Sequence, residues 1–243
     1  MLKQAVNFGI KVLLILLVSF CFITCGIEEY YFLPQVEQNQ VNTDINTYAI
    51  VNIPRIPSEH YYATGYRIYY RIYLSGENNG TRDNPSFSST YNSDYNYFYN
   101  TFNNPSNTTS SIPTITTFSG RGYYELDYYI NTNGGILEFW FPATGLVYNP
   151  YVTLNSNNIT NELKRYSEFV PSDQHHERFF RNTDGLKEAP DSTSRKNLDV
   201  TSSGQTEHAY AAMYIVAVGQ NPQSFTIIYG KPTFISVFKL PNI

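Results

Sequence analysis

Cys25 is the side chain whose type and position together indicate a specific chemistry. It follows Lys3 and Lys11, which make the N-terminus positive, and an uncharged, mostly apolar run over residues 12–24. A basic segment, an apolar segment and a cleavage point in this order are typical of a secretory signal. The apolar run is shorter than the about 20 residues that a membrane-spanning helix needs. We therefore expect a leader that is removed, not a segment that stays in the membrane.

Phe22, Thr24 and Cys25 match the pattern of a bacterial lipobox, which has an apolar residue at −3, a small one at −1 and Cys at +1. The chemistry requires Cys, because its sulfur takes a diacylglycerol in thioether linkage before cleavage makes it the first residue. Thr24 is larger than the usual Gly, Ala or Ser and fits the relaxed form of the motif found in spirochaetes. Cys21 fits less well because the large Phe20 precedes it. The alternative is a plain secretory signal that happens to contain two cysteines.

A lipidated Cys25 would attach the protein to a bilayer. The modified residue would carry several acyl chains, palmitate among them, and several chains anchor a protein stably where a single chain does so only marginally. Cleavage would also remove Cys21, so the mature chain would keep no free thiol and no disulfide. We predict a lipoprotein signal peptide over residues 1–24, followed by the lipidated cysteine and a polar tether over 25–46. The predicted location is the outer membrane of the cell envelope, with membrane lipid as the partner of Cys25.

Residues 173–177, Asp-Gln-His-His-Glu, form the densest group of side chains that could act in catalysis or bind a metal. Adjacent residues of an extended chain point to opposite sides, so His175 and His176 cannot easily share one metal ion. The sequence contains no nucleophile elbow, phosphate-binding loop or HExxH motif. We interpret the group as part of a solvated loop and predict no catalytic residue, no metal site and no cofactor. The alternative is an envelope hydrolase with a site built from loops around His175 or His208.

Aromatic side chains make up 16% of the chain, and several of them are candidates for binding a protein or a glycan. Exposed tyrosines make large, rigid contacts at low entropic cost, as at protein interfaces and sugar-binding platforms. Arginines beside tyrosines can in addition bind through cation–π contacts. The candidate binding residues are Tyr91, Tyr95, Tyr99, Phe102, Arg67 and Arg71. In the alternative interpretation, the rings pack against the sheet and the arginines form a cross-strand ladder.

The overall composition excludes several other classes of protein. The chain has 243 residues and a formal charge of −4, so it lacks the basic surface that nucleic-acid binding normally needs. Its aromatic content provides a sizeable core, which excludes wholesale disorder. Two cysteines cannot form a disulfide-rich scaffold or a cysteine-ligated zinc site.

Alternation of apolar and polar residues marks the elements that must position these side chains. Strands are predicted over residues 48–53, 65–74, 123–130, 136–142, 151–154, 209–218, 224–229 and 233–240. Residues 131–135 have the composition of a hairpin turn between two of these strands. The spacing of aromatic residues over 91–102 predicts a short helix. Strands do not alternate with long amphipathic helices, so we predict a mainly β protein with antiparallel sheets.

The strand over residues 65–74 has two different faces. An apolar face, which we expect to lie toward the core, carries Tyr66, Ile68, Tyr70, Ile72 and Leu74. A mixed face, which we expect to be half exposed, carries Arg67, Tyr69, Arg71 and Tyr73.

Three of these strands resemble strands of fibronectin type III domains. Residues 65–71 look like strand C of that family, 210–219 like strand F and 233–239 like strand G. The Trp typical of strand B is absent, since the only Trp is Trp140, and the segment between strands C and F is far too long. The resemblance implies an antiparallel β-sandwich of the immunoglobulin or fibronectin type III kind. The predicted domain covers residues 47–243, with long insertions near 77–120 and 155–208 and at most one or two short helices.

A second resemblance covers most of the mature chain. Several parts together are similar to uncharacterised lipoproteins of treponemes: the leader that ends in Cys25, the blocks at residues 65–74 and 123–126, and the segments 213–218 and 231–241. The resemblance implies a lipid-anchored protein of the cell envelope. It transfers no functional residue, because these proteins carry no known activity. We therefore predict a non-catalytic binding or structural module, the alternatives being the hydrolase and a carbohydrate-binding module that uses the aromatic stretch.

Overall fold

The computed structural model describes a folded unit that follows the N-terminal segment. The chain divides after Tyr31 into the units Met1–Tyr31 and Phe32–Ile243, and the described residues all belong to the second unit. They are residues 32–44, 48–75, 89–104, 113–141, 150–155, 161–165, 178–180, 199–200 and 208–240. The leader with Cys25, residues 173–177 and parts of both expected insertions lie outside the described residues.

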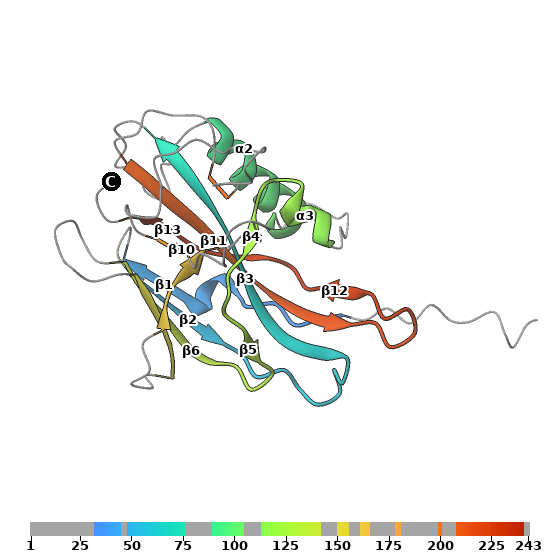
Figure 1. Cartoon of the computed structure of the whole chain (residues 1–243). Coiled ribbons are helices and arrows are strands. Elements are labelled where there is room, and N and C mark those ends of the chain that lie inside the picture. Colours follow the sequence, from blue (N-terminus) through green and yellow to red (C-terminus); the bar gives the residue numbers. More distant parts are fainter. Residues whose placement is uncertain are drawn as a thin grey trace, which may run out of the picture. The chain divides into compact units, whose positions relative to one another are not determined.

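Two antiparallel sheets form most of the described structure (Figure 1). The first sheet contains, in spatial order, β1 (Val41–Asp44), β2 (Tyr48–Ile53), β6 (Gly135–Trp140), β7 (Tyr151–Leu154) and β8 (Asn161–Glu162). The central strand of the second sheet is β11 (His208–Gln220), which pairs with β3 (Ala63–Ser75), β12 (Ile227–Tyr229) and β13 (Thr233–Lys239). Strand β3 pairs on its other side with β4 (Tyr124–Glu125) and β5 (Ile130–Asn131). Two short strands, β9 (Lys164–Arg165) and β10 (Arg178–Phe179), pair with each other. The prediction of a mainly β protein with antiparallel sheets is therefore confirmed.

Short helices cover one face of the second sheet. They are the α-helices α2 (Ser89–Phe98) and α3 (Ile115–Ser119) and the π-helix η2 (Tyr99–Asn103), which continues α2. The 3₁₀ helix η1 (Gln38–Gln40) lies elsewhere, directly before β1 and in contact with β2. Figure 1 shows α2 and α3 over β3 and β11, while β2 and β6 lie on the other side of these strands. The short helix predicted over residues 91–102 is confirmed as α2 and η2. None of the helices in the described ranges is long and apolar enough to cross a bilayer.

The first hydrophobic core lies between the two sheets. Successive residues of a strand point to opposite faces, so every second residue of β3 enters this core, Ile68 and Tyr70 among them. The first sheet contributes Leu137 and Phe139 of β6 from the opposite side. Phe180 is fully buried here, with its ring centroid 4.9 Å from that of Tyr70. The core face predicted for β3 is thus confirmed for its described side chains.

The second hydrophobic core lies between the other face of the second sheet and the helices. Phe98 of α2 sits at its centre, with ring centroids 4.4 Å from Tyr214 and 5.6 Å from Phe118. Burying a side chain of this size stabilises the folded state by about 1.5–3 kcal/mol. The same helices cover Tyr69 and Tyr73, which are buried. The prediction of a half-exposed face on β3 is therefore wrong for these two tyrosines, because a helical layer not evident from the strand pattern lies over them.

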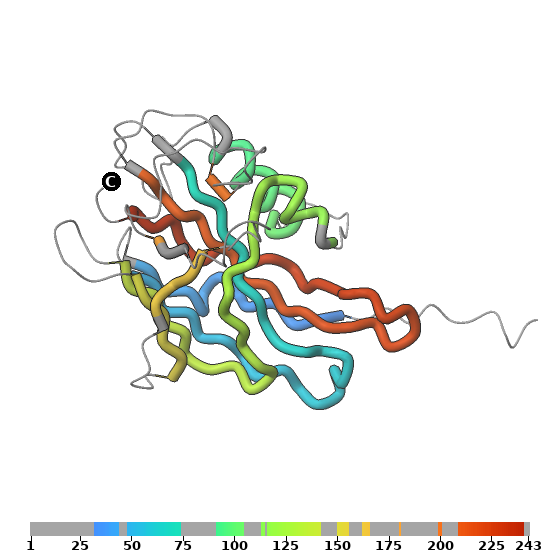
Figure 2. Tube along the Cα trace, in the orientation of Figure 1, coloured from blue at the N-terminus to red at the C-terminus, as the bar shows by residue number. Residues whose placement is uncertain are grey.

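The turn at residues 131–135 does not form the predicted hairpin. Strand β5 before it pairs with β3 in the second sheet, whereas β6 after it pairs with β2 and β7 in the first sheet. The chain therefore crosses from one sheet to the other at this turn, a path that Figure 2 shows. Gly134 has φ +66°, and a Cβ on it would lie 2.3 Å from the carbonyl oxygen of Ile53, so only glycine fits. The strand predicted over 123–130 is likewise reduced to β4 and β5.

The folded unit begins earlier than predicted. Residues 25–46 were expected to form a tether, but β1 pairs with β2 over its whole length. Val36 is fully buried in the first core, and Leu33 packs against it. These apolar contacts dock the stretch together with Gln35, which donates to Asn103 and Thr233.

Candidate functional site

The candidate site is built around Asp94, a carboxylate on the buried face of α2. Tyr91 and Phe98 lie three residues before and four residues after it, so the helical repeat places all of them on the side that faces the sheet. Asp94 is buried with 3% of its surface exposed. A buried carboxylate is costly unless it is paired and hydrogen-bonded, so its partners decide whether the arrangement is stable.

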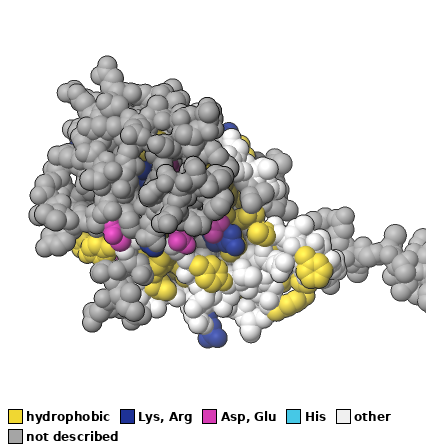
Figure 3. All heavy atoms as spheres, in the orientation of Figure 1, with side chains coloured by type: hydrophobic (Ala, Val, Ile, Leu, Met, Phe, Trp, Pro, Cys, Tyr) yellow, Lys and Arg dark blue, Asp and Glu magenta, His cyan; other side chains and the backbone are white. Residues whose placement is uncertain are grey.

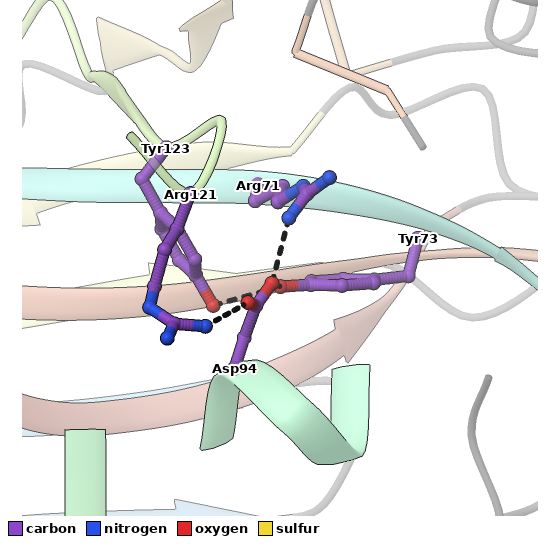
Figure 4. Close-up of polar contacts among 5 residues, drawn as sticks. All are labelled: Arg71, Tyr73, Asp94, Arg121 and Tyr123. Atoms are coloured by element: carbon purple, nitrogen blue, oxygen red, sulfur yellow. Dashed lines mark hydrogen bonds and ion pairs between the residues drawn. The ribbon is translucent and has the colours of Figure 1, made fainter. Parts of the chain in front are cut away.

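Two arginines and a tyrosine hold the Asp94 carboxylate (Figure 4). Arg71 Nη1, from β3, lies 2.7 Å from Oδ2, and Arg121 Nη1, from the turn after α3, lies 2.9 Å from Oδ1. The hydroxyl of Tyr73, also on β3, donates to Oδ2 at 2.6 Å. The Tyr123 hydroxyl lies 2.9 Å from that of Tyr73. Because a hydroxyl has one proton to give, Tyr123 donates to Tyr73, which donates to Asp94.

Burial keeps both tyrosines of this chain neutral. Desolvation raises the pKa of Tyr73 well above its usual value, and the nearby negative charge of Asp94 raises it further. Desolvation also raises the pKa of Tyr123, with a second contribution from Tyr73. Both hydroxyls therefore remain donors at neutral pH. The charge of the group is carried by two arginines and one aspartate.

An open pocket of about 500 Å³ lies beside this network. Its lining consists of Arg71, Asp94, Tyr97, Thr116, Thr117, Gly120, Arg121 and Gly122. The volume falls within the range of about 300–1,000 Å³ that is usual for small-molecule sites. The pocket therefore combines charged, hydroxyl and backbone groups in a space that could hold a small ligand.

Contacts in the pocket wall hold the guanidinium group of each arginine. The Arg121 guanidinium carbon lies 3.5 Å from the ring centroid of Tyr97, in a cation–π arrangement. Arg71 lies against Gly122, where an added Cβ would approach its Nε to 3.2 Å. Gly122 has φ +70°, a conformation that side chains other than glycine rarely adopt. Glycine at this position thus leaves space for the Arg71 guanidinium.

The binding residues predicted from the sequence are not brought together. Of the two arginines, Arg71 belongs to the pocket, whereas Arg67 forms a surface pair with Glu125 at 2.7 Å, in which the two side chains are 30% and 43% exposed. On the face of the molecule that Figure 3 draws, cationic and acidic side chains lie next to each other among small, separate hydrophobic patches. An exposed ion pair stabilises a protein by about 0–1 kcal/mol, so the Arg67 pair needs no functional explanation.

The four predicted aromatic residues lie at different depths. Tyr91 and Phe102 are buried in the second core and are unavailable to a partner. The prediction that Tyr91 and Phe102 bind a partner is therefore wrong, because both lie on the face of α2 and η2 that packs against the sheet. Tyr95 is half-buried, Tyr99 is 44% exposed, and their rings stack at 6.4 Å. A binding role for Tyr95 and Tyr99 stays a prediction.

Asp94, Tyr97 and Arg121 are pocket residues that the sequence analysis did not single out. Asp94 did leave a signal, since a charged residue on the apolar face of a predicted helix requires a buried partner. The sequence around Arg121 carries no such signal, because nothing in it indicates that this side chain contacts Asp94 of α2. In the ranges that the structure describes, no group of three or more potential ligands is arranged to hold a metal ion.

The site can supply positive charge and hydrogen-bond donors. Arginine keeps its proton at any physiological pH, so Arg71 and Arg121 act as fixed charges and not as proton carriers. Asp94 is held between them and shielded from solvent. This chemistry suits the binding of a group with a negative charge.

Comparison with known protein families, curated proteins and solved structures finds no match for this chain.

Proposed function

We propose that this protein is a lipid-anchored lipoprotein of the cell envelope, attached to the outer membrane through Cys25, and that its folded unit is a non-catalytic binding module. The observation that carries the anchor is the cysteine directly after an apolar leader with basic residues before it. The division of the chain after Tyr31 supports this proposal, because it separates Cys25 from the unit that starts at Phe32. The resemblance to treponemal lipoproteins points the same way.

The pocket at Asp94 carries the binding part of the proposal. Its two arginines are oriented by Tyr97 and Gly122, an arrangement that favours holding a ligand over transferring protons. The hydrolase alternative would need a site around His175 or His208. Residues 175 and 176 and the side chain of His208 lie outside the described residues.

We further propose an immunoglobulin or fibronectin type III topology for the two sheets. Strands β3, β11 and β13 are adjacent in one sheet, as strands C, F and G are in those domains. Strands β1, β2 and β6 correspond in the same way to A, B and E. One departure is β7, which pairs with β6 at the position of strand D but follows it in the chain, whereas D precedes E.

A row of rings favours carbohydrate binding as a second candidate function. Tyr48, Trp140 and Tyr151 lie directly opposite one another on β2, β6 and β7, with ring centroids 5.1 Å and 6.2 Å apart. Trp140 is 42% exposed. Rings side by side on a flat sheet face offer an amphipathic stacking surface. This row replaces residues 91–102 as the best-placed aromatic surface, because two of the four residues named there are buried.

The fluorescence of Trp140 tests the carbohydrate candidate directly, because it is the only Trp in the chain. Titration with soluble glycans should shift or quench its emission if sugars stack on this row. Tyr151→Ala should weaken the response, and Tyr99→Ala, on another surface, should leave it unchanged. A glycan-array hit without any change in Trp140 emission would assign the sugar to another surface.

Radiolabelled palmitate tests the anchor. We expect label in the wild-type protein and in Cys21→Ser, and none in Cys25→Ser, because lipid attachment requires the sulfur of the residue after the cleavage site. Equal label in all three proteins, or label that depends on Cys21, would overturn the anchor assignment. Protease treatment of intact cells then reports whether the folded unit faces the outside.

A further inference from the structure

We infer that the pocket between Arg71 and Arg121 binds the carboxylate of a small, hydroxylated organic acid with one negative charge. This inference rests on the proposed binding function and names the class of ligand for the same pocket. The argument depends on the charge of the wall, on its hydrogen-bond donors and on its size.

The charge of the pocket wall is unbalanced. Two arginines face one carboxylate, so one positive charge is left at the pocket after Asp94 is paired. The side chains of Arg71 and Arg121 keep 18% and 29% exposure, whereas that of Asp94 keeps 5%. The positive groups are therefore the accessible ones, and the negative group lies behind them.

The arginines also retain donors that Asp94 does not use. Within the described part of the chain, each guanidinium reaches the Asp94 carboxylate through Nη1 alone. A guanidinium has five N–H donors in a planar fork that matches a carboxylate. A ligand carboxylate can therefore be bound without breaking the contacts to Asp94.

The guanidinium groups are held in place before a ligand arrives. Arg121 is stacked on Tyr97, and Arg71 is packed against Gly122 and bonded to Asp94. A long side chain normally loses rotamer freedom when it binds, and fixing it beforehand removes part of that cost. The network around Asp94 thus orients the binding groups.

Charge and size select the class of acid. A phosphate monoester carries about 1.5 to 2 negative charges at neutral pH, more than the single excess charge of the wall. A carboxylate carries one charge and matches it. Thr116 and Thr117, whose hydroxyl groups also bond to Thr114, line this pocket of about 500 Å³, a size that suits a sugar-sized ligand with hydroxyl groups of its own. A sugar acid meets these requirements.

Isothermal titration of the full-length protein in detergent tests this inference with three probes. D-glucuronate should bind saturably, and its binding should weaken as sodium chloride is added. D-glucose, which has the same ring without the charge, and inorganic phosphate should bind at least tenfold more weakly. No saturable binding of glucuronate, equal binding of glucose, or a preference for phosphate would each overturn the inference. These three arms use the wild-type protein and do not depend on any variant being folded.

Variants then locate the bound acid. Arg121→Gln and Arg71→Gln should each weaken glucuronate binding by about tenfold or more, since each removes a charge-assisted hydrogen bond. Arg67→Gln is the matched control: it removes an arginine from the same face of β3, outside the pocket, and should bind as the wild type does. Unchanged affinity in both pocket variants would overturn the assignment to this pocket.

The outcome is independent of the anchor experiment. Palmitate on Cys25 without glucuronate binding would leave the proposed lipoprotein in place and reject only the ligand class. Glucuronate binding without palmitate would reject the anchor and keep the pocket.

Discussion

Asp94 and Asp199 are two buried carboxylates that β3 contacts from its opposite faces. Tyr73 donates to Asp94 at 2.6 Å in the second core, and Tyr70 donates to Asp199 at 2.8 Å on the side of the first core. Each aspartate also pairs with arginine. The kinds of chemical group are the same in the two places, so the differences between them come from the number of arginines and from solvent access.

The two networks differ in charge balance. Among the described residues one arginine faces Asp199: Arg165 donates to it from Nε at 2.9 Å and from Nη2 at 2.6 Å, and both side chains are buried. This pair is bidentate and closed to solvent, and it joins β9 to β3 through Tyr70. Asp94 has two partly exposed arginines next to an open pocket. The comparison teaches that a closed, one-to-one pair of arginine and aspartate serves the fold, whereas the unbalanced and open network at Asp94 is the one that we propose as a binding site.

The largest effect should come from Arg165→Met. The substitution leaves Asp199 buried without its counter-charge, which costs about 3–5 kcal/mol of the free energy of unfolding. Urea denaturation measures this loss. The double variant Arg165→Met with Asp199→Leu should recover most of it, because no charge is then left in the core. If the single variant is as stable as the wild type, the sealed pair is not a structural element.

Asp94→Ala should cost less, about 2 kcal/mol, because the arginines it leaves behind can turn toward solvent. The same urea measurement compares it with Arg165→Met. A loss equal to that of Arg165→Met would contradict the distinction between an open and a closed network. The ranking of the two variants matters more here than either value.

Alkaline pH should act on two buried tyrosines of β3, Tyr73 in the Asp94 network and Tyr66 outside both networks. Burial raises the pKa of Tyr73 in the folded state above its unfolded value of about 10, so the folded state favours the neutral form. This contribution to stability is complete below about pH 10 and is lost as the pH rises toward the folded-state pKa, by up to about 1.4 kcal/mol per pH unit. Burial also raises the pKa of Tyr66 to about 12, so it loses stability in the same direction. Tyr73→Phe should flatten the fall in stability measured between pH 9 and pH 12, whereas Tyr99→Phe, on the surface, should not.

The smallest effect should come from Arg67→Gln. Its ion pair with Glu125 is exposed to solvent, so the change in the free energy of unfolding should stay within about 0.5 kcal/mol. Thermal unfolding at low and high salt measures it. A loss above 1 kcal/mol would show that the surface arginine of β3 belongs to one of the networks after all.

Most of the strands could be predicted from the sequence, because alternation is a local signal. The pattern predicted over residues 65–74 is β3, and those over 209–218 and 233–240 are β11 and β13. The turn at residues 131–135 shows the limit of this method. Its composition indicates that the chain bends there, but not whether the next strand pairs with the previous one or enters the other sheet.

The candidate site shows the same division. The sequence by itself determined the leader pattern, the strand that carries Arg71 and Tyr73, and the helix that carries Asp94. Only the tertiary structure decided that Arg71 and Arg121 meet at Asp94, which lies 23 positions after Arg71 and 27 positions before Arg121 along the chain. Local patterns specify which face of an element avoids water. Which distant charge neutralises a buried carboxylate is decided by the packing of the whole layer, and so is the positive charge left over beside it.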